Sequence, residues 1–335
     1  MEKIIHFNVG NGNCSVIQLK DFLMIIDLNH SEDSKSSYEM LEPYLRVVNN
    51  IRVIDVLIIT HGDEDHCKDF KIIKEKIDNG ELIVGAIGHQ GYDRRLVSKI
   101  KDLPLDYLML QEEIDRRKKI ENNTFGNIQI ALRAKNDERV LFNELKKPEN
   151  LSLKILSPFD CDNETSDYSH NELSVILNVE VSGLRVLYTS DASSKYWQTR
   201  IVPELLQDEH FSHWAKSDIL EVGHHGSYDF FGEDRDTVRE SSDYPDNYEA
   251  LSYISPNDII VSAESRFPIN GDCSGDSPPH YAAWKWYHRW FRDNRGINED
   301  DKHPNCFKYT SDGSIKIEYS GFTWTWDNNW DLDES

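Results

Sequence analysis

The segment THGDEDH places four potential metal ligands within six residues of the chain. These are His61, Asp63, Asp65 and His66. They stand between an apolar run at 53–59 and a helical pattern that begins near residue 66, and such loops are where α/β proteins gather functional side chains. Imidazole and carboxylate together suit zinc, manganese or iron. We therefore interpret this segment as part of a metal site.

Further candidate ligands stand beside apolar runs downstream. Asp191 follows the run LRVLYTS, and His224 and His225 follow ILEVG in the string EVGHHGS. His170 precedes the run ELSVILNV. Each residue stands just before or just after a predicted strand, in a consistent order, so unrelated turn residues are a poor explanation of the set. We predict that they supply a second metal position.

The elements that position these residues alternate between strand and helix patterns. Strands are predicted over 4–9, 14–19, 22–28, 53–59, 82–87, 151–156, 174–181, 184–189, 218–222, 258–263, 306–310, 314–319 and 322–326. Helices are predicted over 36–48, 66–77 and 194–206, and from the prolines at 278–279 to Gly296. Between residues 92 and 150 the apolar pattern weakens, which indicates a solvated helix or an insertion.

Composition narrows the class of protein and of partner. Hydrophobic residues at 38% and charged residues at 29% indicate a globular protein, and no apolar run approaches the ~20 residues that span a bilayer. The chain begins without a secretion signal and its five cysteines are scattered, so we expect a cytoplasmic protein without a membrane partner. A net charge of −23 repels phosphate. Binding a nucleic acid would require metals, a protein partner, or a basic patch such as Arg94, Arg95, Lys99 and Lys101.

Taken in order, THGDEDH, Asp191 and HHGS resemble the metallo-β-lactamase superfamily. The closer resemblance is to the hydrolase domain of ComEC-type DNA-uptake proteins and their stand-alone soluble relatives. FNVGNGNCSVI is similar to that branch's opening DVGQGD turn, LMIIDLN to its LIDTG element, and SAESRF with the later Pro279-His280 to its closing segment. The resemblance spans roughly residues 3 to 290.

This resemblance implies an αββα sandwich, in which two mixed β-sheets are flanked by helices. The hydrolase domain would cover residues 1–295, with an insertion around 92–150. Residues 296–335 would form a C-terminal β and aromatic extension that packs on the domain.

Carried over residue by residue, the resemblance implies a centre of two divalent metal ions, Zn²⁺ or Mn²⁺. His61 and Asp63 would bind the first ion, Asp65, His66 and one histidine of HHGS the second, and Asp191 would bridge them. His225 is preferred to His224 as that ligand, and Asp27 would orient the loop through hydrogen bonds.

The chain departs from the superfamily pattern at the first metal position. Many members carry histidine where this chain has Asp63, and the place of a further histidine falls to His170 or Asn171. More carboxylate and less imidazole favour manganese, or a labile or single ion.

The expected chemistry is hydrolysis by a water that the metals deprotonate. Asp65 would act as general base or orient that water, and His224 and His280 are candidates to protonate the leaving group. Ser227 is a candidate to donate a hydrogen bond to phosphate. For His280 and Ser227, a role confined to the turn is an equal alternative.

The leading functional prediction is a metal-dependent phosphodiesterase that acts on DNA or RNA. A small phosphodiester or a cyclic nucleotide is an alternative substrate, and the acidic composition would tolerate it better. Another alternative is a catalytically weak interaction module of a bacterial, defence-like multi-gene system. In that case the tail FTWTWDNNWDLDES could dock a protein partner.

Overall fold

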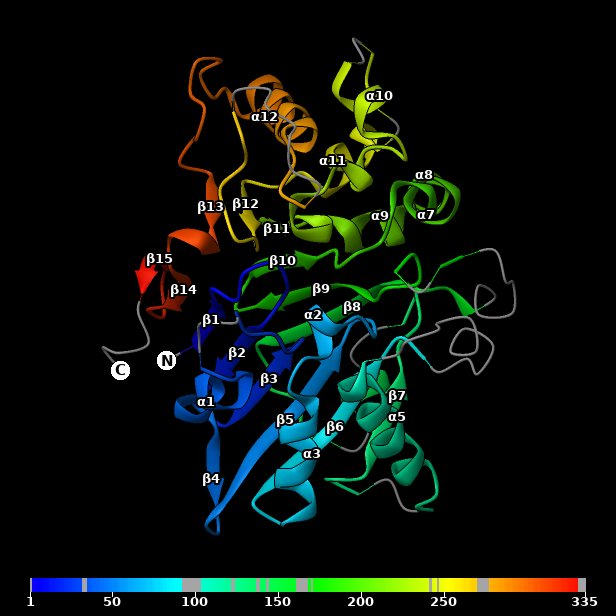
Figure 1. Cartoon of the computed structure of the whole chain (residues 1–335), viewed down its shortest axis with the longest axis vertical. Coiled ribbons are helices and arrows are strands. Elements are labelled where there is room, and N and C mark those ends of the chain that lie inside the picture. The colour runs from blue at the N-terminus through cyan, green and yellow to red at the C-terminus, as the bar shows by residue number, and fades with distance from the viewer. Residues whose placement is uncertain are drawn as a thin grey trace.

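Two β-sheets face each other across the centre of the molecule, and helices cover their outer faces (Figure 1). The computed structural model describes residues 2–31, 35–91, 104–121, 124–136, 139–142, 145–160, 168–169, 171–240, 243–245, 247–269 and 277–330. The first sheet has the strand order β15-β14-β1-β2-β3-β5-β6-β7, with β4 paired to β5. Its strands are β1 (Glu2–His6), β2 (Ser15–Leu19), β3 (Phe22–Ile26), β4 (Arg46–Val48), β5 (Ile51–Ile59), β6 (Leu82–His89), β7 (Ile128–Ala131), β14 (Ser314–Tyr319) and β15 (Trp324–Trp330).

The second sheet has the strand order β13-β12-β11-β10-β9-β8. Its strands are β8 (Leu151–Ser157), β9 (Ile176–Val181), β10 (Leu184–Tyr188), β11 (Ile219–Glu221), β12 (Asp258–Val261) and β13 (Phe307–Tyr309). Both sheets are mixed. In the first, β3, β5, β6 and β7 run parallel, and in the second β10, β11, β12 and β13 do so. The carboxyl ends of parallel strands lie at the same edge of a sheet, and the candidate ligands stand in the loops that leave this edge.

Helices are short over most of the chain. They are α1 (Ser37–Leu41), α2 (Glu64–Cys67), α3 (Phe70–Asp78), α5 (Leu105–Lys118), α6 (Arg139–Phe142), α7 (Ser194–Tyr196), α8 (Val202–Gln207), α9 (Glu209–Ala215), α10 (Arg235–Glu240), α11 (Tyr248–Ile254) and α12 (Tyr281–Arg295). Figure 1 shows α3 and α5 outside the first sheet and α9, α11 and α12 outside the second.

Three layers of buried apolar side chains hold this arrangement together. Because successive strand residues face opposite sides of a sheet, Ile4 packs between the two sheets with Val179 of the second, while Ile5 packs outward in the cluster that contains Phe70 of α3. The outer face of the second sheet packs against α12 through the fully buried Trp286. Tyr287, Trp290 and Phe291 of α12 are buried in the same cluster, so this face of the helix belongs to the core. The predicted αββα sandwich is confirmed.

Two predicted helices are shorter in the structure. The pattern over 36–48 yields α1, a 3₁₀ turn at Glu42–Tyr44 and then β4, because Pro43 lacks the amide hydrogen that a continuing helix requires. The helix predicted over 66–77 is divided into α2 and α3 at Asp69, whose φ of 68° is left-handed.

The less regular parts of the sequence contribute to both sheets. Within 92–150, the fully buried Arg117 of α5 donates to Glu113 and to carbonyl oxygens of β6 and β7, so α5 is fixed to the first sheet. Beyond residue 296, β13 extends the second sheet, and β14 and β15 extend the first.

The predicted basic patch at 94–101 lies outside the described residues. Among those described, no helix has the length and apolarity of a bilayer-spanning segment.

Candidate metal centre

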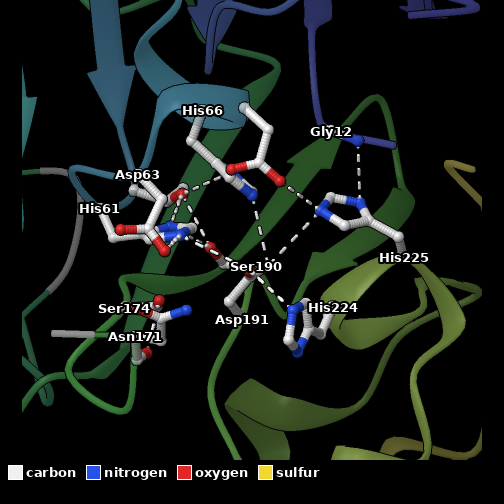
Figure 2. A network of polar contacts seen from close by, with 12 residues as sticks. Gly12, His61, Asp63, His66, Asn171, Ser174, Ser190, Asp191, His224 and His225 are labelled. Atoms are coloured by element: carbon white, nitrogen blue, oxygen red, sulfur yellow. Dashed lines mark hydrogen bonds and ion pairs between the residues drawn. The ribbon is translucent and has the colours of Figure 1, made fainter. Parts of the chain in front are cut away.

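The candidate ligands follow the carboxyl ends of strands in both sheets, and their side chains point toward one another (Figure 2). The THGDEDH loop leaves β5 and enters α2. Asp191 follows β10, and His225 follows the neighbouring parallel strand β11. Figure 2 shows His61, His66 and His225 arranged around Asp191.

Asp191 joins the imidazoles into one cluster. Its Oδ2 lies 3.5 Å from Nε2 of His61, and its Oδ1 lies 3.2 Å from Nε2 of His66 and 3.9 Å from Nε2 of His225. All four of these residues are buried. The two oxygens of one carboxylate therefore face two different sets of imidazole nitrogens, as a bridging ligand requires.

Two groups of potential ligand atoms result, each with its atoms within 4.8 Å of one another. One consists of Asp65, His66, Asp191 and His225, and the other of His61, Asp63 and Asp65. Oδ2 of Asp65 lies 3.1 Å from Nε2 of His225, while Oδ2 of Asp63 lies 3.8 Å from Nε2 of His61. Asp65 belongs to both groups, so the two groups adjoin at this residue.

The donor set fits divalent cations. Three imidazoles and three carboxylates suit ions such as Zn²⁺ or Mn²⁺. Nε2 of His66 and Oδ1 of Asp191 are buried 3.2 Å apart, and neither atom has a well-formed hydrogen bond to a described residue. Buried polar atoms are almost always paired, so these two atoms fit a cluster that binds a cation.

A network of hydrogen bonds orients the imidazoles. The buried carboxylate of Asp27 accepts hydrogen bonds from the backbone nitrogen and the hydroxyl of Thr60, both at 2.7 Å, and lies 2.7 Å from Nδ1 of His66. Ser190 donates to the Thr60 hydroxyl at 2.7 Å and lies 3.2 Å from Nδ1 of His61. With each Nδ1 engaged, both rings present Nε2 to Asp191.

Charge within the cluster shifts the pKa values of Asp65, Asp191 and His66. Burial favours a neutral Asp65 carboxyl, but the imidazoles of His66 and His225 hold its pKa below the ordinary value. Although burial favours a neutral carboxyl, the imidazoles of His66 and His61 hold the pKa of Asp191 well below its ordinary value. Burial also opposes the imidazolium form of His66, but the carboxylates of Asp191 and Asp27 raise its pKa well above the ordinary value. A cation that binds Nε2 of His66 would therefore meet ionised carboxylates and would release a proton.

The HHGS turn has a strained backbone that separates its two histidines. His224 and His225 adopt left-handed φ values of 47° and 54°, and so do Ser190 and Asp27, at 48° and 58°. Such strain collects at functional sites where the surroundings enforce it. Nδ1 of His225 lies 3.0 Å from the carbonyl oxygen of Ser262 and 3.1 Å from the backbone nitrogen of Gly12. In the tautomer that presents a bare Nε2 to a cation, Nδ1–H would donate a hydrogen bond to the Ser262 carbonyl oxygen.

His224 lies outside both ligand groups. Its Nδ1 lies 2.8 Å from Oδ2 of Asp229, and its Nε2 is 3.7 Å from Oδ2 of Asp191. Its side chain is 32% exposed. Burial opposes its charged form, but the hydrogen bond with Asp229 and the charge of Asp191 raise the pKa of His224 to about 9. The geometry therefore favours His225 as the ligand and leaves His224 accessible at the rim.

Asn171, Ser227 and His280 belong to neither group of ligand atoms. Figure 2 shows Asn171 on the side of His61, and the carbonyl oxygen of Asn171 accepts hydrogen bonds from the backbone and hydroxyl of Ser174. The hydroxyl of Ser227 accepts from the backbone nitrogen of Asp229 at 3.3 Å. Nδ1 of His280 accepts from the backbone nitrogen of Tyr228 at 3.3 Å. Ser227 and His280 thus both contact the segment that follows HHGS. His170 lies outside the described residues.

Several residues at the centre were not predicted from the sequence. They are Gly12, Thr60, Ser190, Asp229 and Ser262. Thr60 and Ser190 directly precede predicted ligands, and that position could have suggested them. The roles of Asp229 and Ser262 depend on side-chain and backbone contacts that no local pattern encodes.

The model of the metallo-β-lactamase superfamily matches residues 7–242. The chain belongs to the metallo-β-lactamase superfamily. Its members are generally metal-dependent hydrolases that bind divalent metals, and this chain is a metal-dependent hydrolase of the superfamily. The family and the fold confirm the resemblance inferred from the motifs.

The chain is similar in sequence to one known protein and in structure to two others. ComE operon protein 3 of Bacillus subtilis (strain 168) is 26% identical over 228 residues, which are 67% of this chain and 22% of that protein. The chain therefore spans about a fifth of the length of this relative. Igni18, described as a metallo hydrolase from Ignicoccus hospitalis, is 11% identical with a TM-score of 0.45, covering 95% of this chain and 100% of that one. The metallo-β-lactamase fold protein YhfI from Bacillus subtilis is 12% identical with a TM-score of 0.42, covering 78% of this chain and 87% of that one.

Proposed function

We propose that this metallo-β-lactamase superfamily hydrolase is a phosphodiesterase that cleaves nucleic acid. The observation that carries the proposal is the position of Asp191, whose Oδ1 lies beside His66 of one ligand group and whose Oδ2 lies beside His61 of the other. Paired divalent cations are suited to phosphoryl centres because they can neutralise charge on both the attacking and the leaving oxygen. The resemblance of the motifs to ComEC-type DNA-uptake proteins favours nucleic acid as the substrate.

Two ions, Zn²⁺ or Mn²⁺, would occupy the centre. His61 and Asp63 would hold one ion. The other ion would be held by Asp65, His66 and His225. Asp191 would contribute to both positions. Bound there, the ions would polarise the phosphoryl group and lower the pKa of a water molecule. Figure 2 shows Asn171 on the side of His61, where its side-chain amide could supply a further oxygen ligand.

The side chains divide the proton transfers between two sides of the centre. Asp65, with a side chain that is 37% exposed, would orient the attacking water and accept its proton. His224 would donate a proton to the leaving oxygen from the rim. Asp229 would fix the orientation of the His224 ring through the 2.8 Å contact at Nδ1, which leaves Nε2 facing the centre.

A second candidate function is hydrolysis of a small phosphodiester such as a cyclic nucleotide. The observation that favours it is the net charge of −23, because a long nucleic acid is repelled along its whole length and a small substrate is not. Both candidates use the same residues and differ only in the length of the substrate.

Hydrolysis by the purified protein tests the proposal. The substrates are labelled single- and double-stranded DNA and RNA, cyclic nucleotides and bis(p-nitrophenyl) phosphate, each with Mn²⁺, Zn²⁺ or Mg²⁺. The proposal expects metal-dependent cleavage of a polymer that Asp65→Ala abolishes and Asp78→Ala, at an exposed aspartate of α3, does not. Cleavage of cyclic nucleotides alone would favour the second candidate. No hydrolysis with any metal would refute both and would favour an interaction module.

A further inference from the structure

A polar cavity of about 570 Å³ opens beside the metal centre, and Asp65 is the residue that the two share. Its walls come from the turn at residues 8–11, from residues 29–31, from Glu64 and Lys68 in and after α2, and from Glu264. Ligand pockets in proteins range over about 300–1,000 Å³, so the cavity is large enough for a nucleoside.

Amide groups form one wall of this cavity. Asn29 donates to the carbonyl oxygens of Val9 and Asn11, and the side chain of Asn11 accepts from the backbone nitrogen of Glu264 at 3.1 Å. These contacts fix the turn in place. The side chain of Asn8, which also lines the cavity and is exposed, can hydrogen-bond to a sugar hydroxyl or to the edge of a base.

The charges around the cavity are mainly negative. Glu64, Asp65 and Glu264 contribute carboxylates, and Glu64 and Glu264 are exposed. Against them stands the ammonium group of Lys68, which donates to the carbonyl oxygen of His30 at 3.2 Å. With cations at the centre, Asp65 would be neutralised there, but Glu64 and Glu264 would still face any group in the cavity. A second phosphate in this position would be repelled.

We propose that this cavity binds the uncharged nucleoside on one side of the scissile phosphate and rejects a further phosphate there. The inference rests on the proposed phosphodiesterase function and specifies its substrate class. Preferred substrates are diesters in which one flanking nucleoside ends the molecule, as at a strand terminus or in a dinucleotide. Along a continuous strand, the next phosphate would meet Glu64 and Glu264.

The size of the effect follows from Coulomb's law. Two unit charges several ångströms apart in water interact by about the thermal energy, or roughly two- to threefold in an equilibrium constant, and salt weakens this further. Two glutamates should therefore lower kcat/KM for the phosphorylated substrate by about five- to tenfold at low salt, mainly through KM.

Dinucleotides with and without a terminal phosphate test the proposal. The thymidine dinucleotide TpT is compared with its 5′-phosphorylated and 3′-phosphorylated forms, because either end could enter the cavity. One phosphorylated form should be cleaved about five- to tenfold less efficiently than TpT. The double variant Glu64→Gln with Glu264→Gln should close that gap, as should 0.5 M salt. The matched control is Glu75→Gln with Glu180→Gln, which removes two exposed charges elsewhere and should leave the gap unchanged.

Bis(p-nitrophenyl) phosphate separates failure of the inference from failure of the proposed function. If it is hydrolysed while TpT and both phosphorylated forms are cleaved equally, the cavity does not select against phosphate and the inference is overturned. A gap that persists in the double variant overturns the role of Glu64 and Glu264. If no diester is hydrolysed, the proposed function fails and the inference fails with it.

Discussion

Replacing Asp27 by asparagine should weaken metal binding although Asp27 is not itself a proposed ligand. Its buried carboxylate accepts two hydrogen bonds from Thr60 and faces Nδ1 of His66 at 2.7 Å. The amide that replaces this carboxylate would have one acceptor oxygen in place of two. If its NH₂ group turned toward His66, the imidazole proton would move to Nε2, the atom that should bind a cation.

The magnitude follows from the contacts that are lost. A hydrogen bond to a charged group contributes about 1.5–3 kcal/mol, so the loss of one should reduce the free energy of unfolding of the metal-free protein by about 2 kcal/mol. Removing a residue that orients a metal-binding histidine typically lowers metal affinity by about 10–100-fold. We expect a loss of affinity in that range for Asp27→Asn.

Competition with a chromogenic chelator measures the affinity, and urea unfolding in EDTA measures the stability. The matched control is Asp55→Asn. Asp55 is also buried and accepts from the backbone of Leu23 and from Arg46 at 2.8 Å, but it is not part of the metal centre. This control should lose stability and keep its metal affinity. Equal affinities in the two variants, within about threefold of the parent protein, would refute the orienting role of Asp27.

Four other substitutions test separate parts of the account. His225→Ala should weaken metal binding by more than about 100-fold. His224→Ala should bind metal normally and lose about 10²–10⁴-fold in kcat. Identical behaviour of the two variants in chelator competition and kinetics would contradict the assignment of His225 as ligand and His224 as proton donor. Glu113→Ala should cost about 3–5 kcal/mol in urea unfolding because it strands the buried Arg117. Burial opposes the charge on Glu113, but hydrogen bonds from the guanidinium groups hold the pKa of Glu113 below its ordinary value. The parent protein therefore keeps the stability from this ion pair at pH values above the ordinary carboxyl pKa. It loses that stability as the pH falls through the lowered pKa of Glu113. Gly12→Ala should cost about 1–3 kcal/mol, since φ is 141° and a Cβ would lie 2.7 Å from a backbone oxygen of α2; unchanged thermal unfolding would contradict this.

The sequence predicts the strands that carry the ligands because their signal is local. Unbroken apolar runs mark the central strands, and the motif residues stand at the ends of those runs. The αββα sandwich and the superfamily follow from the motifs and are confirmed. The ligand assignments and the nuclease activity stay predictions that the geometry supports.

The parts that could not be predicted depend on contacts between distant residues or on backbone conformation. Ser190 and Thr60 are 130 positions apart, yet their hydroxyls form one hydrogen bond. The pairing of β14 with β1 likewise joins opposite ends of the chain. His224 and His225 are adjacent in sequence, and only the left-handed turn directs one into the ligand cluster and the other toward Asp229.

The metal content of the purified protein tests the central claim most directly. After reconstitution with Zn²⁺ or Mn²⁺ and removal of free ions, mass spectrometry of the bound metal should find two ions per chain. His61→Ala and His225→Ala should each lower that number, and Asp191→Ala should lower it further because this residue faces both groups. A parent protein that binds no metal, or variants that all keep the parent stoichiometry and affinity, would contradict the account.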